Sequence, residues 1–110
     1  MLDGFNTQQH QRRRYPKTAD DVFRALVTVT QREYTVKSVD EMTRTVMFEA
    51  WESKLTWGEI FTAMVLDAEK GCDLEISGVG KVGGQVQQAT ALVNTMAHVF
   101  EKVSAELSAH

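Results

Sequence analysis

The sequence predicts an α+β domain in which a four-stranded antiparallel meander carries two helices on one face. Residues 18–32 and the residues from 86 onward show apolar side chains at helical spacing. Between them lie four β-rich segments separated by short polar turns, which favour antiparallel neighbours. Each predicted helix has a single apolar stripe, and two such helices are expected to pack against one side of the sheet.

The composition is that of one folded domain. The chain has 110 residues, of which 43% are hydrophobic and 25% charged, so it can bury enough apolar surface to fold. We expect a flexible polar arm at residues 1–14 and a single domain at residues 15–110. No apolar run approaches the ~18 residues of a membrane span, and the N-terminus lacks a secretion signal. These features indicate a soluble, cytoplasmic protein.

The two helices are predicted from their first turns and their apolar stripes. Thr18 is a favourable N-cap, and Asp20 and Asp21 place negative charge where the helix dipole stabilises it. The C-terminal helix is expected to start at Val86. Its predicted apolar side comprises Ala89, Leu92, Val93, Met96, Phe100, Val103 and Leu107.

The predicted strands cover residues 34–39, 45–51, 56–68 and 72–79. The first two are expected to form a hairpin around Asp40, and the glycine-rich segment Gly78–Gly84 to connect the last strand with the C-terminal helix.

Four short stretches resemble a group of small uncharacterised bacterial domains, known mainly from actinobacteria, with α-β-β-β-β-α order. These stretches are residues 17–23, the hairpin around Asp40, residues 55–59 and residues 76–78. The chain also resembles, more loosely, helix-grip (Bet v 1-like) domains, in which a curved sheet grips a long C-terminal helix around an apolar cavity. The first resemblance implies no catalytic residues.

The sequence Gly78-Val-Gly80-Lys-Val-Gly83 matches the G-x-G-x-x-G pattern of dinucleotide sites. That motif needs a strand after the helix and an acidic residue about 20 positions on to hold the ribose. Here the given sequence ends with the helix, and Glu101 lies within it. We therefore predict no cofactor site.

Catalytic and metal sites are not predicted either. Cys72 is the only cysteine, which excludes an internal disulfide, and acidic neighbours make it a poor reactive thiol. His10 lies in the predicted arm, and His110 is the last residue of the given sequence. His98 lies opposite the apolar stripe, as a surface residue does, and has no cysteine or second histidine near it to share a metal. The carboxylates, Glu59 among them, are interpreted as a solvated sheet face and turns. The chain is thus predicted not to be an enzyme.

The third predicted strand is apolar on both faces. Trp57, Glu59, Phe61, Ala63 and Val65 alternate with Ile60, Thr62, Met64 and Leu66. Because the helices can cover only one face, something else must cover the second. We expect a homodimer or another protein partner here; a hydrophobic ligand, a neighbouring domain and a twisted strand protected by loops are alternatives. The interface candidates are Met47, Ile60, Thr62, Met64 and Leu66.

Two other functions remain open from the sequence. A small hydrophobic ligand could be held between the sheet and the C-terminal helix, in a pocket lined by Phe48, Trp57, Phe61, Met96 and Phe100. The cluster Arg12-Arg13-Arg14 could make a weak contact with an anionic polymer, although the net charge of −3 gives no general reason to expect nucleic acid.

Overall fold

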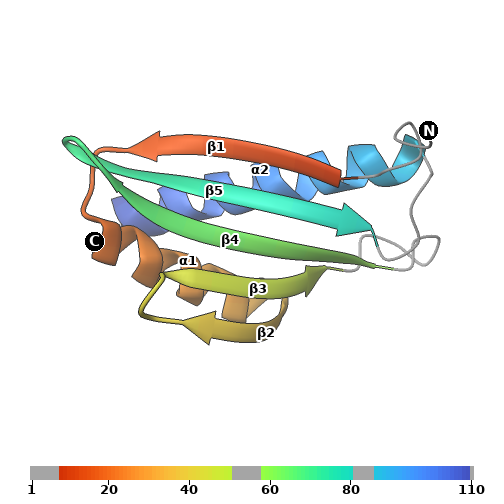
Figure 1. Ribbon diagram of the computed structural model, residues 1–110, viewed down its shortest axis with the longest axis horizontal. Helices are drawn as coiled ribbons and strands as arrows, with labels where there is room; N and C mark the ends of the chain where they lie inside the picture. The colour runs from red at the N-terminus through yellow and green to blue at the C-terminus, as the bar shows by residue number, and fades with distance from the viewer. Residues whose placement is uncertain (1–7, 51–57, 81–85, 110) are drawn as a thin grey trace.

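The computed structural model describes residues 8–50, 58–80 and 86–109. It contains a five-stranded antiparallel sheet of order β1-β5-β4-β3-β2 with both helices behind it (Figure 1). The elements in chain order are β1 (Gln8–Tyr15), α1 (Ala19–Glu33), β2 (Thr35–Asp40), β3 (Thr45–Ala50), β4 (Glu59–Ala68), β5 (Gly71–Gly80) and α2 (Val86–Ser108). The predicted α+β class and the placement of two helices on one face are confirmed.

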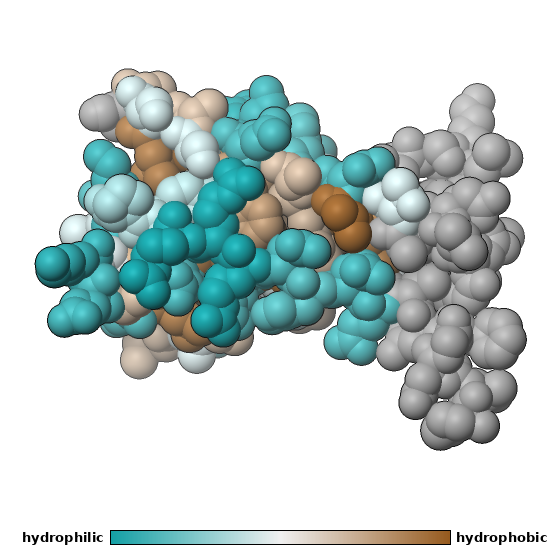
Figure 2. Space-filling view, turned by 90° about the horizontal axis from the view of Figure 1, so that it is seen from above, coloured by the Kyte–Doolittle hydropathy of each residue, from teal (hydrophilic) through white to brown (hydrophobic). Residues whose placement is uncertain are grey.

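The fifth strand is the main difference from the prediction. Residues 8–14, expected to belong to a flexible arm, form β1 with Tyr15 and pair along their whole length with β5, from Gln8 opposite Val79 to Tyr15 opposite Cys72. The prediction failed because β1 has no apolar alternation: all its side chains except those of Gln9 and Tyr15 are exposed. Figure 2 looks onto this edge of the molecule and shows a largely hydrophilic surface. Charged side chains on an edge strand discourage pairing with other chains.

Helix α1 begins as its sequence predicts. The hydroxyl Oγ1 of Thr18 accepts a hydrogen bond from the backbone N–H of Asp21 at 3.1 Å, and Asp20 and Asp21 occupy the first turn. The stripe of Val22, Ala25, Leu26 and Val29 is buried. Burial of this stripe places α1 against the sheet beside α2.

Helix α2 buries a stripe slightly rotated from the predicted one. Val99, which was not in the predicted stripe, is fully buried, whereas Val93 is 36% exposed. Leu92, Met96, Phe100 and Val103 are buried as predicted. The face of α2 that packs against β5 and β1 is therefore centred on Met96 and Val99.

The core lies between the helices and the sheet face that they cover, which we call the inner face. Alternate residues of β4 and β5 point into it: Phe61, Ala63 and Val65 from β4, and Cys72, Leu74 and Ile76 from β5. The opposite side of the sheet, the outer face, is not covered by α1 or α2 (Figure 1).

Candidate functional site

An aromatic stack lies on the inner face across β3 and β4, next to the residue that precedes β2. The rings of Phe48 and Phe61 are stacked with centroids 5.1 Å apart and an interplanar angle of 14°. Tyr34, at the end of α1, lies 5.1 Å from Phe48. Because Phe48 and Phe61 are directly opposite in the β3–β4 ladder, the strand register itself produces the stack.

The stack continues under α2 because β5 has a glycine at this level. A Cβ added at Gly78 would lie 2.6 Å from two ring atoms of Phe61 and 3.1 Å from the Met96 methyl carbon. The ring of Phe61 and the end of Met96 therefore occupy the space that a side chain at position 78 would fill.

Four of the five predicted pocket residues belong to one buried cluster. Phe48, Phe61 and Met96 are fully buried, and Phe100 is 4% exposed. Trp57 lies outside the described residues. The sequence therefore identified side chains that meet between the sheet and α2, as the ligand hypothesis requires.

Phe100 is also the point where β1 meets α2. The Tyr15 hydroxyl donates a hydrogen bond to the Phe100 carbonyl oxygen at 2.9 Å, and the guanidinium carbon of Arg13 lies 4.9 Å from the centre of the Phe100 ring. Burial raises the pKa of the Tyr15 hydroxyl, so this hydroxyl remains a donor across the neutral range.

The sequence interpretation of Glu59 as a solvated carboxylate is wrong. Glu59 begins β4, is fully buried, and shares the inner face with Phe61. Its direct neighbours in the flanking strands are small: Ala50 on β3 and Gly80 on β5. The strand's alternation had already placed Glu59 on the same side as Phe61, and this was the signal that could have identified it.

A carboxyl group in such a position is costly. Moving an ionised carboxylate out of water carries a penalty of several kcal/mol that only strong compensating interactions can offset. Glu59 is the one acidic side chain among the buried residues of the described chain. This makes it the most informative polar group of the interior.

The five predicted interface residues all lie on the outer face. Ile60, Thr62 and Met64 are half-buried on β4, whereas Met47 and Leu66 are each 38% exposed. The alternation predicted for this strand, with Phe61 inside and Ile60 outside, agrees with its burial pattern.

The three arginines of β1 are divided between the two faces. On the outer face, Arg12 pairs with Glu75, and Arg14 donates to Asp73 at 2.5 Å. The hydrogen bond from Arg14 lowers the pKa of the Asp73 carboxyl. Because Arg12 and Arg14 already face acids on β5, they carry little free positive charge for an anionic polymer.

The glycine motif is divided by the end of β5. Gly78 and Gly80 lie within the strand, so the expected connector does not include residues 78–80, and Gly83 lies outside the described residues. In chain order β5 is followed by α2. Among the described residues no strand follows α2 to complete a βαβ unit of the kind that a dinucleotide site requires.

Cys72 and the histidines form no reactive centre in the described part of the chain. Cys72 is buried, and burial raises the pKa of its thiol, which agrees with a structural role. His98 is a surface residue, as predicted, but it contacts Glu33. No three metal-ligating side chains come together among the residues with described positions. None of the described helices is long and apolar enough to cross a membrane.

No family model matches this chain, and no curated protein matches it by sequence. Solved structures with the same fold include Ara h 8.0201, with a TM-score of 0.73, 10% identity, and coverage of 94% of this chain and 98% of that one. CalU16 from Micromonospora echinospora has a TM-score of 0.68, 10% identity, and coverage of 92% and 76%.

A third similar structure is the di-domain ARO/CYC BexL from the BE-7585A biosynthetic pathway, with a TM-score of 0.58 and 12% identity. This chain covers 44% of it, with 93% of its own length aligned. Because ARO/CYC proteins are among the structures with this fold, the prediction that the chain is not an enzyme gains no support from the comparisons. At these identities the likeness concerns the fold, and it confirms the predicted resemblance to helix-grip domains.

Proposed function

We propose that this chain binds a small, mainly apolar molecule between the inner face of the sheet and α2, with the Glu59 carboxyl as its polar contact. The observation that carries the proposal is the complete burial of Glu59 on the inner face. Ligand sites of this class combine an apolar lining with a few polar groups that fix orientation. The likeness in fold to Ara h 8.0201 supports the resemblance to helix-grip domains, which implies an apolar cavity between the sheet and the C-terminal helix.

The neighbours of Glu59 support a ligand contact at its carboxyl. Ala50 and Gly80 flank it on the inner face and have little or no side-chain bulk. The next inner-face residue of the strand is Phe61, whose ring stacks on Phe48. A flat apolar body next to these rings, with a hydroxyl or amine directed toward Glu59, matches this arrangement of groups.

The test compares two probes that differ in one hydroxyl, 2-naphthol and naphthalene, by fluorescence titration. Glu59→Gln is expected to weaken 2-naphthol binding about tenfold and to leave naphthalene binding unchanged. The matched control is Glu49→Gln, because Glu49 lies in the strand beside Glu59 but on the outer face, near Lys37. Equal loss of both probes, or the same effect from both variants, would contradict a polar contact at Glu59.

Homodimerisation through the outer face is the second candidate function. It rests on the partial exposure of Met47 and Leu66, with Ile60 and Met64 between them on the same face. Light scattering should then show a dimer that Met64→Asp dissociates, whereas Thr35→Asp at the exposed edge of this face should not. A strictly monomeric chain at high concentration would eliminate this candidate.

A further inference from the structure

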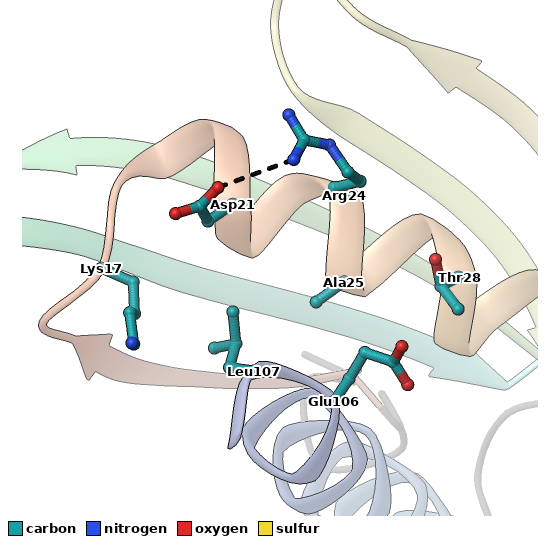
Figure 3. Close-up of a pocket in the computed structure, with 7 residues that line it drawn as sticks. All are labelled: Lys17, Asp21, Arg24, Ala25, Thr28, Glu106 and Leu107. Carbon is teal, nitrogen blue, oxygen red and sulfur yellow. Dashed lines mark ion pairs between the residues drawn. The ribbon is translucent and has the colours of Figure 1, made fainter. Parts of the chain in front are cut away.

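A concave site lies on the helical side of the molecule, between α1 and α2. It is a groove of about 490 Å³ between the first three turns of α1 and the end of α2. Figure 3 shows its lining residues: Lys17, Asp21, Arg24, Ala25, Thr28, Glu106 and Leu107. Its volume lies within the range of small-molecule sites.

The groove follows one stripe of α1. Asp21, Ala25 and Thr28 recur at helical spacing, and the seven-residue step from Asp21 to Thr28 corresponds to a length of ~10 Å. Between these polar ends the lining includes two apolar side chains. Ala25 is buried, and the half-buried Leu107 packs against the core from α2. The middle of the groove thus suits a short hydrocarbon group.

Among the charged side chains that line the groove, Lys17 gives one end a positive charge. Asp21 faces Arg24 across 3.7 Å, and Glu106 faces Arg32 across 3.3 Å, so each acid already has an arginine. Lys17 lines the groove, and none of the ion pairs within the described residues includes it. In Figure 3 the Lys17 side chain lies at one end, beside Leu107.

We infer that this groove binds a small monocarboxylate, with its anionic group on Lys17 and its apolar body over Leu107 and Ala25. The contact with Lys17 is a charge-assisted hydrogen bond, and Leu107 supplies the apolar surface that a short chain can cover. This site is independent of the proposed interior site and uses none of its residues.

Hexanoate is the probe that tests the inference, with acetate and hexanamide as comparison compounds. Titration followed by backbone amide chemical shifts should show hexanoate affecting residues 17–28 and 105–108. Acetate lacks the apolar body and hexanamide lacks the charge, so both should bind at least about tenfold more weakly, a difference of about 1.4 kcal/mol.

Two matched variants identify the cation. Lys17→Gln should raise the Kd for hexanoate about tenfold, whereas Lys37→Gln, which removes an exposed lysine on β2, should leave it unchanged. Lys17 is exposed, and the amide spectrum verifies that the variant folds. Binding of hexanamide as tight as that of hexanoate, an unchanged Kd in Lys17→Gln, shift changes confined to other residues, or no saturable binding would each overturn the inference.

Discussion

The ring nitrogen Nε2 of His98 lies 2.6 Å from the carboxylate oxygen Oε1 of Glu33, and this contact joins α2 to the last turn of α1. The His98 ring also meets the Tyr34 ring edge-on, with centroids 6.4 Å apart. Because Tyr34 packs on Phe48, a surface contact between the helices is continuous with the aromatic stack of the interior.

This contact makes stability sensitive to acid. The hydrogen bond with His98 lowers the pKa of Glu33 below its ordinary value of 4.5. A lowered folded-state pKa contributes stability above pH 4.5, and this contribution is lost as the pH falls through the folded-state value. His98→Ala should therefore lose less stability than the unmodified chain when urea unfolding at pH 6 is compared with pH 3. His10→Ala is the control, since the His10 ring contacts the Ser77 hydroxyl at 2.9 Å and its Nε2 comes no nearer than 4.0 Å to the Glu75 carboxylate. Equal acid sensitivity in all three proteins would contradict this prediction.

Tyr15→Phe should destabilise the fold by about 1 kcal/mol, because it removes the buried hydrogen bond to the Phe100 carbonyl. The Ser104 hydroxyl oxygen lies 2.9 Å from that carbonyl oxygen and 3.3 Å from the Tyr15 hydroxyl, and its single proton can be donated to either of them. Ser104→Ala combined with Tyr15→Phe should thus be non-additive in urea unfolding. Strict additivity of the two changes would show that the network does not couple β1 to α2.

Amide hydrogen exchange tests whether residues 8–15 form a strand. In an antiparallel edge strand, alternate N–H groups point to the neighbouring strand and the others to solvent. We therefore expect protection at every second residue of β1, because β1 pairs with β5 from Gln8 to Tyr15. Exchange at the rate of an unfolded peptide throughout this segment would instead support the flexible arm that the sequence suggested.

Gly78→Ala should cost about 1–3 kcal/mol of unfolding free energy, because its Cβ would overlap the Phe61 ring. Phe61→Leu in the same chain should recover part of that loss by removing the ring. Gly71→Ala should cost more, since its Cβ would lie 2.2 Å from the Tyr15 carbonyl oxygen at a φ of +150°. Urea unfolding ranks the variants, and a neutral Gly78→Ala would show that the Phe61 ring does not occupy this space.

The elements that the sequence predicted well are those with strong apolar periodicity. The stripe of Val22, Leu26 and Val29 identified α1, and the alternation around Phe61 placed the two faces of β4. Strand β1 could not be predicted in this way, because Tyr15 is its one apolar side chain. Its contacts with β5 include backbone pairing and the ion pairs of Arg12 and Arg14.

The site was predictable in part for the same reason. The aromatic and methionine side chains of the interior carry a periodic signal, and Phe48, Phe61, Met96 and Phe100 were identified from it. Glu59 was assigned to solvent because it is a carboxylate, although its position in the alternation indicated burial. The groove at Lys17 depends on α1 and α2 lying side by side, and no local pattern in the sequence reports that contact.

The central proposal is that a ligand enters between the sheet and α2, and the methionine methyl groups report on it directly. Met96 is buried under α2, Met47 and Met64 lie on the outer face, and Met42 is 92% exposed in a turn. When 2-naphthol is titrated into protein with ¹³C-labelled methionine methyl groups, we predict a saturable shift of the Met96 signal with Met47, Met64 and Met42 unchanged. Shifts confined to Met47 and Met64, or no saturable change at Met96, would contradict the account.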